Sequence, residues 1–275
     1  MRGRMRFYDA HNHLQEERFE GRQEALIREC RAVGVVRMVV NGSSEEDWEQ
    51  VATLARQHPD LILPAFGVHP WYSGEVGPDW QAQLTRWLEE LPNAGVGEIG
   101  LDRWRRGLDP AKQEAVFRAQ WRIAVERNLP VTVHCLRAWT WLLKVLETEP
   151  TPSCGWLFHS FGGPAEAIEP FLRRGAYFSL AGYFARPDRQ ERTKVFQRIP
   201  LERILIETDA PDQCLPPERD RYGLVENQTG RRINHPANLS EVYEFAAELL
   251  GIEIDKLAEQ VEANFHRLFV EKAPA

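Results

Sequence analysis

The sequence predicts an α/β fold, a single (β/α)8 barrel of the TIM type that spans residues 1–275. Short apolar runs rich in β-branched residues alternate with helical stretches along the whole chain, which is typical of a parallel sheet. There are eight such runs, as many as the barrel has strands. The alternative is an open doubly wound sheet, but its glycine-rich turn after the first strand is replaced here by His-Asn-His.

The predicted strands, in order, cover residues 6–10, 36–41, 61–67, 94–99, 131–135, 155–159, 176–180 and 203–208. The predicted helices cover residues 22–33, 45–57, 80–90, 111–127, 137–147, 164–173, 189–197, 240–250 and 254–270. Asp109-Pro110 and Asn238-Leu239-Ser240 put polar caps before two helices, where free N–H groups need acceptors. The connection 210–238 is long and rich in Pro, Arg and Asp, so we expect a functional or mobile loop.

The composition is that of a globular protein and makes some functions improbable. Hydrophobic residues make up 43% of the chain and charged residues 27%, as in globular proteins. The net charge of -7 argues against a protein that coats nucleic acid, but it allows an enzyme that handles one strand end in a locally basic cleft. The sequence has no apolar run of about 18 residues, so we expect no membrane span.

The four cysteines lie far apart and form no C-x-x-C pair, which argues against a structural zinc module. Isolated cysteines suggest a reducing compartment. No apolar stretch follows the basic residues 1–6, so we expect no secretion signal. These features together predict a cytoplasmic protein.

The first predicted strand ends in a His-x-His pair. Side chains alternate along a strand, so His11 and His13 point to the same side and could hold one divalent metal. Further candidate ligands stand at or just past the ends of later strands, namely Glu98, His134, His159 and Asp209. Barrel enzymes place their active sites at this rim. Six nitrogen and oxygen ligands converging there would suit two divalent metals.

The mixture of ligands has a chemical reason. Imidazole suits zinc, manganese or iron, and carboxylate also suits harder cations. Glu98 could bridge two ions about 3.5–4 Å apart, and Asp209 could orient the attacking water and carry protons. Each residue also has a plainer explanation: a histidine at a strand end is more often structural, Glu98 could pair with Arg103, and Asp209 could be a turn residue. The placement of all six at one rim favours a metal site.

The same residues belong to longer motifs. In chain order these are Asp9-Ala-His11-Asn-His13, Gly67-Val-His69-Pro70, Gly97-Glu98-Ile-Gly-Leu-Asp102, Leu129-Pro-Val-Thr-Val-His134, Phe158-His159-Ser-Phe-Gly162-Gly163 and Ile206-Glu207-Thr-Asp209-Ala-Pro211. Together they resemble the TatD family of metal-dependent deoxyribonucleases over nearly the whole chain. The resemblance implies a TIM-like barrel, one or two divalent ions (Zn, Mg or Mn) and phosphodiester hydrolysis. By position, it implies metal ligation by His11, His13, Glu98, His134, His159 and Asp209.

Residues beside these motifs are candidates for substrate binding. His69 could contact a substrate phosphate, or it could be a loop histidine bonded to backbone. Four arginines could hold phosphate oxygens, because a guanidinium presents a planar fork to them; they are Arg103, Arg137, Arg231 and Arg232. Three tryptophans at rim positions could stack on a base, namely Trp71, Trp104 and Trp139.

Departures from the family pattern fall where substrate should lie. The chain has Arg232-Ile-Asn234-His235-Pro236, where the family usually has Arg-Asn-Glu-Pro. It has Cys135-Leu136-Arg137, where the family tends to have Ser-Arg after the histidine. These changes spare the candidate ligands, so they bear on the substrate more than on the reaction.

Three functions are compatible with these observations. The first is a metal-dependent phosphodiesterase that acts on DNA ends through a metal-activated water. The second is a small-molecule hydrolase for an ester, lactone, amide or phosphoester, which the acidic net charge and the altered loops favour. The third, a non-catalytic metal-binding scaffold, fits poorly with six retained candidate ligands. We expect no obligate protein partner.

Overall fold

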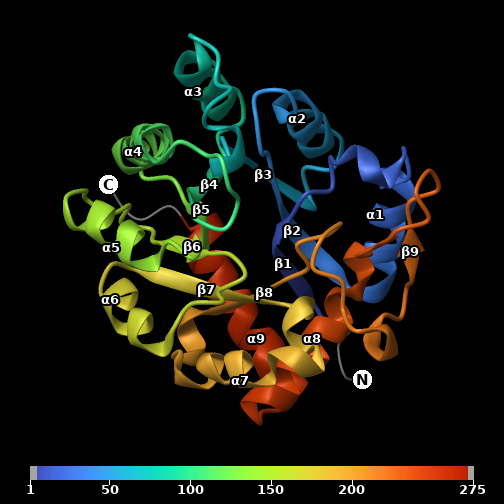
Figure 1. Cartoon of the computed structure of the whole chain (residues 1–275). Helices are drawn as coiled ribbons and strands as arrows, with labels where there is room; N and C mark the ends of the chain where they lie inside the picture. Colours follow the sequence, from blue (N-terminus) through green and yellow to red (C-terminus); the bar gives the residue numbers. More distant parts are fainter. Residues whose placement is uncertain (1–4, 272–275) are drawn as a thin grey trace.

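Eight parallel strands pair in chain order from β1 to β8 in the computed structural model, which describes residues 5–271. They form a ring with the helices outside it (Figure 1). The strands are β1 (Phe7–Asn12), β2 (Val35–Asn41), β3 (Ile62–Phe66), β4 (Gly95–Asp102), β5 (Val131–Leu136), β6 (Trp156–Phe158), β7 (Ala176–Ala181) and β8 (Ile204–Glu207). The predicted (β/α)8 barrel is confirmed. Residues 1–4 and 272–275 of the predicted domain lie outside the described residues.

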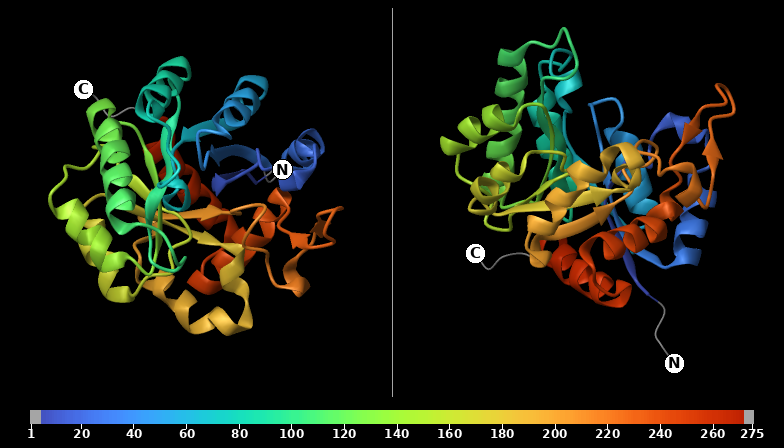
Figure 2. Two further views of the ribbon diagram at one scale, coloured as in Figure 1. Left: turned by 45° about the horizontal axis from the view of Figure 1, so that its top comes forward. Right: turned by 60° about the horizontal axis from the view of Figure 1, so that its bottom comes forward.

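Helices follow the strands along the chain and cover the outside of the ring in both views of Figure 2. They are α1 (Gln23–Val33), α2 (Trp48–Gln57), α3 (Trp80–Glu90), α4 (Pro110–Arg127), α5 (Trp139–Glu147), α6 (Ile168–Leu172), α7 (Gln190–Thr193), α8 (Leu239–Leu250) and α9 (Ile254–Phe265). The last predicted helix ends earlier than expected at Phe265, and a π-helical turn (His266–Val270) continues it.

Two further helices are reduced to one or two turns. In 164–173, a 3-10 turn (Ala165–Ala167) precedes α6, and Pro170 within α6 lacks the N–H that a longer helix would need. In 189–197, α7 lies between two 3-10 turns, Pro187–Arg189 and Lys194–Arg198. These segments therefore cover β6 and β7 with short turns in place of long helices.

The seam between β8 and β1 is closed by the chain just beyond β8. The N–H of Asp209 donates to the carbonyl oxygen of His11 at 2.9 Å, and the N–H of His13 donates to that of Ala210 at 2.8 Å. Buried Asp9 accepts hydrogen bonds from the N–H and the hydroxyl of Thr208, at 2.9 and 2.6 Å. Polar contacts thus tie the first strand to the last at the same edge that carries the candidate ligands.

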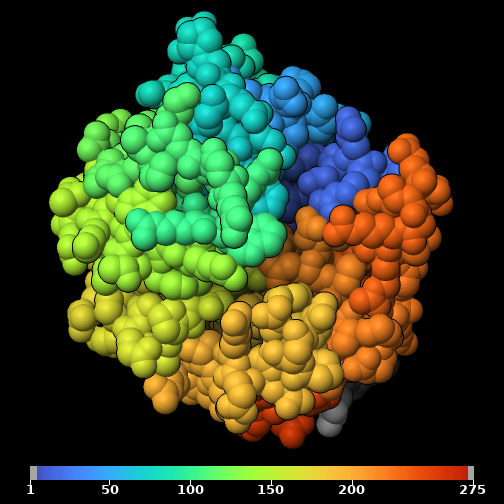
Figure 3. All heavy atoms as spheres, viewed as in Figure 1, coloured from blue at the N-terminus to red at the C-terminus, as the bar shows by residue number. Residues whose placement is uncertain are grey.

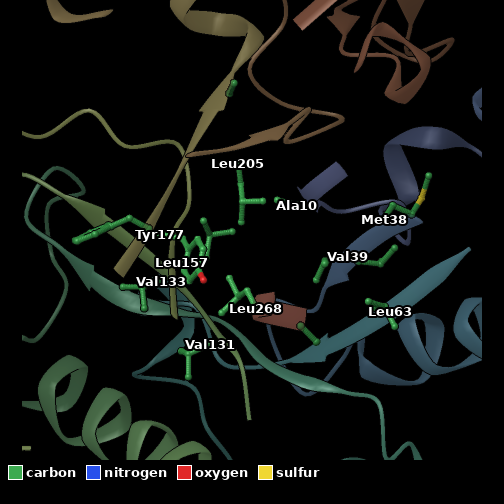
Figure 4. Close-up of a cluster of buried hydrophobic side chains, with 14 of the residues drawn as sticks. Ala10, Met38, Val39, Leu63, Val131, Val133, Leu157, Tyr177, Leu205 and Leu268 are labelled. Carbon is green, nitrogen blue, oxygen red and sulfur yellow. The ribbon is translucent and has the colours of Figure 1, made fainter. Parts of the chain in front are cut away.

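Apolar side chains from nearly all strands fill the core beneath that edge. Figure 4 shows a part of this core, in which Leu268 of the π-helical turn lies among side chains such as Val39, Leu157 and Leu205 from β2, β6 and β8. Packed branched side chains of this kind make the barrel interior a solid support and not a pore.

The two predicted helix caps have different outcomes. The carboxylate of Asp109 accepts hydrogen bonds from the N–H groups of Ala111 and Lys112, as predicted for the start of α4. Asn238 does not cap α8 with its side chain, so this prediction is wrong. Its amide instead donates to Asp220 at 2.8 Å and its oxygen accepts from the N–H of Tyr222, because the preceding loop folds back over the start of α8.

The long connection 210–238 is ordered by a two-stranded hairpin, β9 (Leu224–Val225) and β10 (Arg232–Ile233). Arg22 donates to the carbonyl oxygen of Val225 at 3.0 Å, and the N–H of Asn227 donates to Glu20 at 3.1 Å. The hairpin therefore lies beside the start of α1, where Figures 1 and 2 show it in orange next to blue. Among residues 5–271, no helix is both long and apolar enough to cross a membrane.

Candidate functional site

A cleft of about 1430 Å³ opens where the strands end. In the space-filling view this face is hollowed near its middle, among the green, yellow and orange segments (Figure 3). Five of the six predicted ligands line the cleft, and His11 is fully buried behind them. The five are His13, Glu98, His134, His159 and Asp209.

Glu98 lies inside β4, because this strand runs on to Asp102, whereas the sequence predicted a strand that stops at residue 99. The chain packs tightly around it. A Cβ atom on Gly97 would come within 2.7 Å of Asn41 Oδ1, and one on Gly100 would overlap the carbonyl oxygen of His134. Glycine on each side of Glu98 therefore lets the neighbouring strands close around this carboxylate.

One group of ligand atoms converges at the end of β1. His11 and His13 direct their Nε2 atoms at each other, 3.1 Å apart. Asp209 Oδ1 lies 3.2 Å from the first and 3.6 Å from the second of these nitrogens. Glu98 Oε2 lies 3.5 and 3.2 Å from the same two atoms. Two imidazoles and two carboxylates thus share one small space.

The other carboxylate oxygen of Glu98 faces a second group of imidazoles. Glu98 Oε1 lies 2.9 Å from His159 Nε2, 3.1 Å from His134 Nδ1 and 3.5 Å from His69 Nε2. The structure therefore brings all six predicted ligands together, with Glu98 between the two groups. His69 also lies in this second group, although the sequence made it a candidate for substrate binding. It is close enough to Glu98 and His134 to share a cation with them.

Partners outside the cluster fix the orientation of these rings. His13 Nδ1 faces the carbonyl oxygen of Asn41 at 2.8 Å, which leaves its Nε2 toward the cluster. His134 Nε2 lies 2.9 Å from Asp102 Oδ2, which leaves its Nδ1 toward Glu98. Hydrogen bonds to the far nitrogen of an imidazole are the usual means by which proteins hold a metal-binding histidine.

The two carboxylates stay ionised despite their burial. Burial alone would raise the pKa of Glu98, but the charges of His159 and His69 and hydrogen bonds from His11 and His13 hold it well below its usual value. Burial would likewise raise the pKa of Asp209, and the hydrogen bond from His11 with the charge of His159 lowers it to about 2. Two ionised carboxylates therefore lie at the centre of the cleft.

The two carboxylates and burial shift the pKa values of the nearby imidazoles in different directions. Burial would lower the pKa of His13, but its hydrogen bond to Glu98 and the charges of Glu98 and Asp209 raise it to about 10. The pKa of His159 is also raised well above its usual value, mainly by Glu98, against its burial. Burial dominates at His69, whose pKa falls to about 3. The site attracts positive charge, which either protons or metal ions can supply.

The residues present fit a divalent metal. Buried Glu98 Oε1 has no hydrogen-bond donor among the described residues, although three imidazoles surround it. A buried polar group without a partner is costly, and a cation beside these oxygen and nitrogen atoms would satisfy it. Imidazole with carboxylate is a donor set that suits zinc and manganese, and its carboxylates also suit magnesium.

Several residues just past the strand ends have left-handed backbone conformations, which are unusual outside glycine. Arg137 after β5 has φ 57°, Ser160 after β6 has φ 46°, and Asp209 after β8 has φ 51°. Such conformations cluster at functional sites because the surrounding structure has to stabilise them. At Asp209 that conformation accompanies a side chain that reaches back to the histidines at the end of β1.

The arginines predicted to bind substrate have different positions. Arg137 lines the cleft and is exposed. Arg103 packs its guanidinium on the ring of Trp141, 5.0 Å from the centroid, and does not line the cleft. Arg232 donates to the carbonyl oxygen of Leu215 and lies 3.4 Å from Asp220, also away from the cleft.

Two of the three rim tryptophans form a stack at the cleft. Trp71 and Trp104 have their ring centroids 6.3 Å apart at 24°, and both line the cleft. Arg105 covers Trp71, 4.8 Å from its centroid, while Trp104 is 52% exposed. Trp139 also lines the cleft but packs against the core ring of Phe158. An exposed indole face is therefore available at Trp104.

Sequence reasoning gave Asp102 no role, yet this residue joins the stack to the metal cluster. Its Oδ2 faces His134 Nε2 and accepts from Trp71 Nε1, both at 2.9 Å. The N–H groups of Trp104 and Arg105 donate to its Oδ1. Strand alternation was the available signal, because residues 98 and 102 lie on the same face of β4.

The chain resembles known proteins along nearly its whole length. A family model described as TatD related DNase matches residues 8–270. The 3′-5′ ssDNA/RNA exonuclease TatD of Erwinia tasmaniensis is 32% identical over 263 residues, covering 95% of this chain and 99% of the relative. The protein of the same name from Escherichia fergusonii is 33% identical over 267 residues, covering 95% and 98%.

Solved structures with a similar fold include a TatD homologue and a lactonase. A TatD homologue from Escherichia coli K12 matches with a TM-score of 0.87 at 27% identity, covering 98% of this chain and 99% of the other. A lactonase from Listeria monocytogenes matches with a TM-score of 0.60 at 15% identity, covering 98% and 96%. The second likeness extends to the fold alone.

Proposed function

The chain belongs to the family of TatD related DNases, and we propose that it is a divalent-metal-dependent exonuclease that removes nucleotides from the 3′ end of single-stranded DNA or RNA. The observation that carries this proposal is the convergence of imidazole and carboxylate ligand atoms on both oxygens of Glu98. The names of the curated relatives support the substrate and the direction.

We propose that the six residues that the sequence singled out would hold the divalent metal. The ligands are His11, His13, Glu98, His134, His159 and Asp209. When bound, such ions polarise a phosphodiester and make a water molecule more acidic. The imidazole-rich donor set favours zinc or manganese over magnesium. His69 lies next to these ligands and is available to a phosphate oxygen or to a further cation.

The chain's own residues orient the reactants. Ionised Asp209 accepts a hydrogen bond from Gln213 at 2.7 Å, which leaves its other oxygen facing the imidazoles. In this position it can orient the attacking water, take its proton and return a proton to the leaving sugar oxygen. Asp102 holds His134 in place from behind. The exposed face of Trp104 offers a surface on which an unpaired base can stack.

A small-molecule hydrolase is the second candidate, and the size of the cleft argues against it. Pockets for small ligands usually measure about 300–1,000 Å³, whereas this cleft measures about 1430 Å³. Its aromatic and basic lining also suits a polynucleotide strand better than a lactone.

We further propose a reducing, cytoplasmic location, because the four cysteines are all free.

A substrate panel tests this function. Metal-reconstituted protein is offered single-stranded DNA, RNA, a phosphomonoester, a lactone and a simple ester at equal concentration. We expect kcat/KM for the two nucleic acids to exceed that for the other substrates by at least about 100-fold, on the order of the gain that correct positioning supplies. Faster turnover of the lactone or the ester would refute the proposal in favour of the second candidate.

A further inference from the structure

Four arginines at the cleft have no partner for their guanidinium groups. Arg137, Arg192, Arg198 and Arg231 all line the cleft and are exposed. Within residues 5–271, none of them has an ion pair, a side-chain hydrogen bond or an aromatic ring contact. Elsewhere on the surface, arginines such as Arg31, Arg127 and Arg219 are paired with carboxylates.

The acidic groups of the same cleft are already occupied. Glu16 and Asp212 pair with Arg18, at 3.0 and 2.7 Å. Glu191 pairs with Lys194 at 2.6 Å. Glu98 and Asp209 face the imidazoles of the metal cluster. The four arginines therefore leave uncompensated positive charge at the cleft of a chain whose net charge is -7.

These arginines lie in the connections that follow β5, β7 and β8 around the rim. Arg192 belongs to α7 and Arg198 to the turn after it, both between β7 and β8. Arg231 precedes β10 of the hairpin, and Arg137 follows β5. The stacked Trp71 and Trp104 follow β3 and β4, which lie half a turn of the eight-stranded ring away from β7 and β8. The metal cluster lies between the aromatic part and the main basic part of the rim.

We propose that Arg192 and Arg198, with Arg137 and Arg231, form a track that holds the backbone phosphates on the 5′ side of the scissile bond. The inference rests on the proposed exonuclease function. After the 3′ nucleotide reaches the metal cluster, the rest of the strand has to leave the cleft, and a row of unpaired guanidinium groups suits its phosphates. Phosphate contacts of this kind hold a strand without reading its sequence.

Substrate length tests the track directly. The variant with Arg192→Ala and Arg198→Ala is compared with the natural protein on a dinucleoside monophosphate and on a single-stranded 20-mer. The short substrate has one phosphate and does not reach the track, so its KM should change little. We expect the KM of the 20-mer to rise at least about tenfold more than that of the dinucleotide, since two charge-assisted phosphate contacts are lost.

The salt dependence of binding provides a second readout that needs no turnover. Affinity for a 3′-phosphorothioate 20-mer is measured by fluorescence anisotropy at several salt concentrations. Each phosphate contact to a single strand contributes about 0.7 to the slope of log K against log salt. The double variant should therefore lower the magnitude of this slope by about 1.4.

Arg28→Ala with Arg267→Ala is the matched control, because both side chains are exposed and lie outside the cleft. Equal losses on the two substrates, or an unchanged salt slope, would overturn the track. If the natural protein cleaves neither substrate, the exonuclease function fails. A normal salt slope that falls in the Arg192 and Arg198 variant would still support a nucleic-acid track in that case.

Discussion

At the residue scale, Asp209 shows how the fold prepares a single side chain for chemistry. Its backbone is left-handed, its N–H is bonded to β1, and Gln213 holds one carboxylate oxygen. The other oxygen is 3.2 Å from His11 Nε2. The carboxylate therefore has little freedom to turn away from the cluster, as a residue that positions water and carries its proton requires.

Asp209→Asn tests this role. The amide keeps the shape but cannot accept a proton, so kcat should fall at least about 100-fold, the low end of what general base catalysis supplies. Asp212→Asn is the control, because this nearby carboxylate pairs with Arg18 at 2.7 Å and points to no ligand. Circular dichroism should match the natural protein, and the five remaining ligands should still bind metal when it is supplied in excess. Undiminished kcat in a folded, metal-loaded Asp209→Asn protein would remove Asp209 from the mechanism.

The sequence was informative about the candidate ligands but not about what holds them. His11, His13 and Asp209 follow from strand alternation and from their position at strand ends. The contacts of Asp102 with Trp71 and His134 join three separate segments, so no local pattern could predict them. The position of His69 beside Glu98 could not be predicted either, because it also depends on a contact between distant segments. The role of each predicted ligand stays a proposal until metal binding is measured.

At the scale of elements, α4 is fastened to the chain after α5 by one acidic residue. Glu149, whose side chain is only 4% exposed, accepts from Arg118 and Arg122 of α4 at 2.7 Å each. The hydrogen bond from Arg122, together with that from Arg118 and against some desolvation, lowers the pKa of Glu149 below 4.5. An acid whose pKa is lowered by folding stabilises the fold while it is ionised.

Glu149→Gln should therefore lower the Tm at pH 7, by about 2–4 °C for a loss near 1 kcal/mol in a protein of this size. The stabilisation is complete above the unfolded pKa of about 4.5 and disappears as the pH falls through the lowered pKa of the folded state. The Tm difference between variant and natural protein should shrink accordingly. Glu147→Gln, at the exposed end of α5, is the control. A Tm difference that stays constant down to pH 3 would contradict this assignment.

Prediction of elements succeeded where patterns were long and periodic. All eight strands and the long helices α1, α4 and α8 were predicted close to their observed bounds. The segments 164–173 and 189–197 were not, because prolines and tertiary contacts limit their helices to single turns. Arg192 lies in the second of these segments and Arg198 directly follows it, so the basic part of the cleft could not be predicted from helix periodicity.

At the scale of the whole molecule, the residues that stabilise the barrel and the residues of the candidate site lie in different places. The apolar core supports the strands from within, and the polar residues gather at the rim where the strands end. The net charge of -7 does not reveal this local pattern, because the excess of acidic residues over the whole chain outweighs the few unpaired arginines of the cleft. A single domain over 1–275 stays a prediction, which limited proteolysis can address.

The most direct measurement is turnover of a 5′-labelled single-stranded 20-mer by chelator-stripped protein, before and after Zn²⁺, Mn²⁺ or Mg²⁺ is returned. The stripped protein should lose at least about 100-fold in rate, since the metal supplies both the activated water and charge stabilisation. Added metal should restore a ladder of products that shortens one nucleotide at a time from the 3′ end. Undiminished hydrolysis by the stripped protein, or a restored activity that cuts only inside the strand, would contradict a metal-dependent 3′ exonuclease.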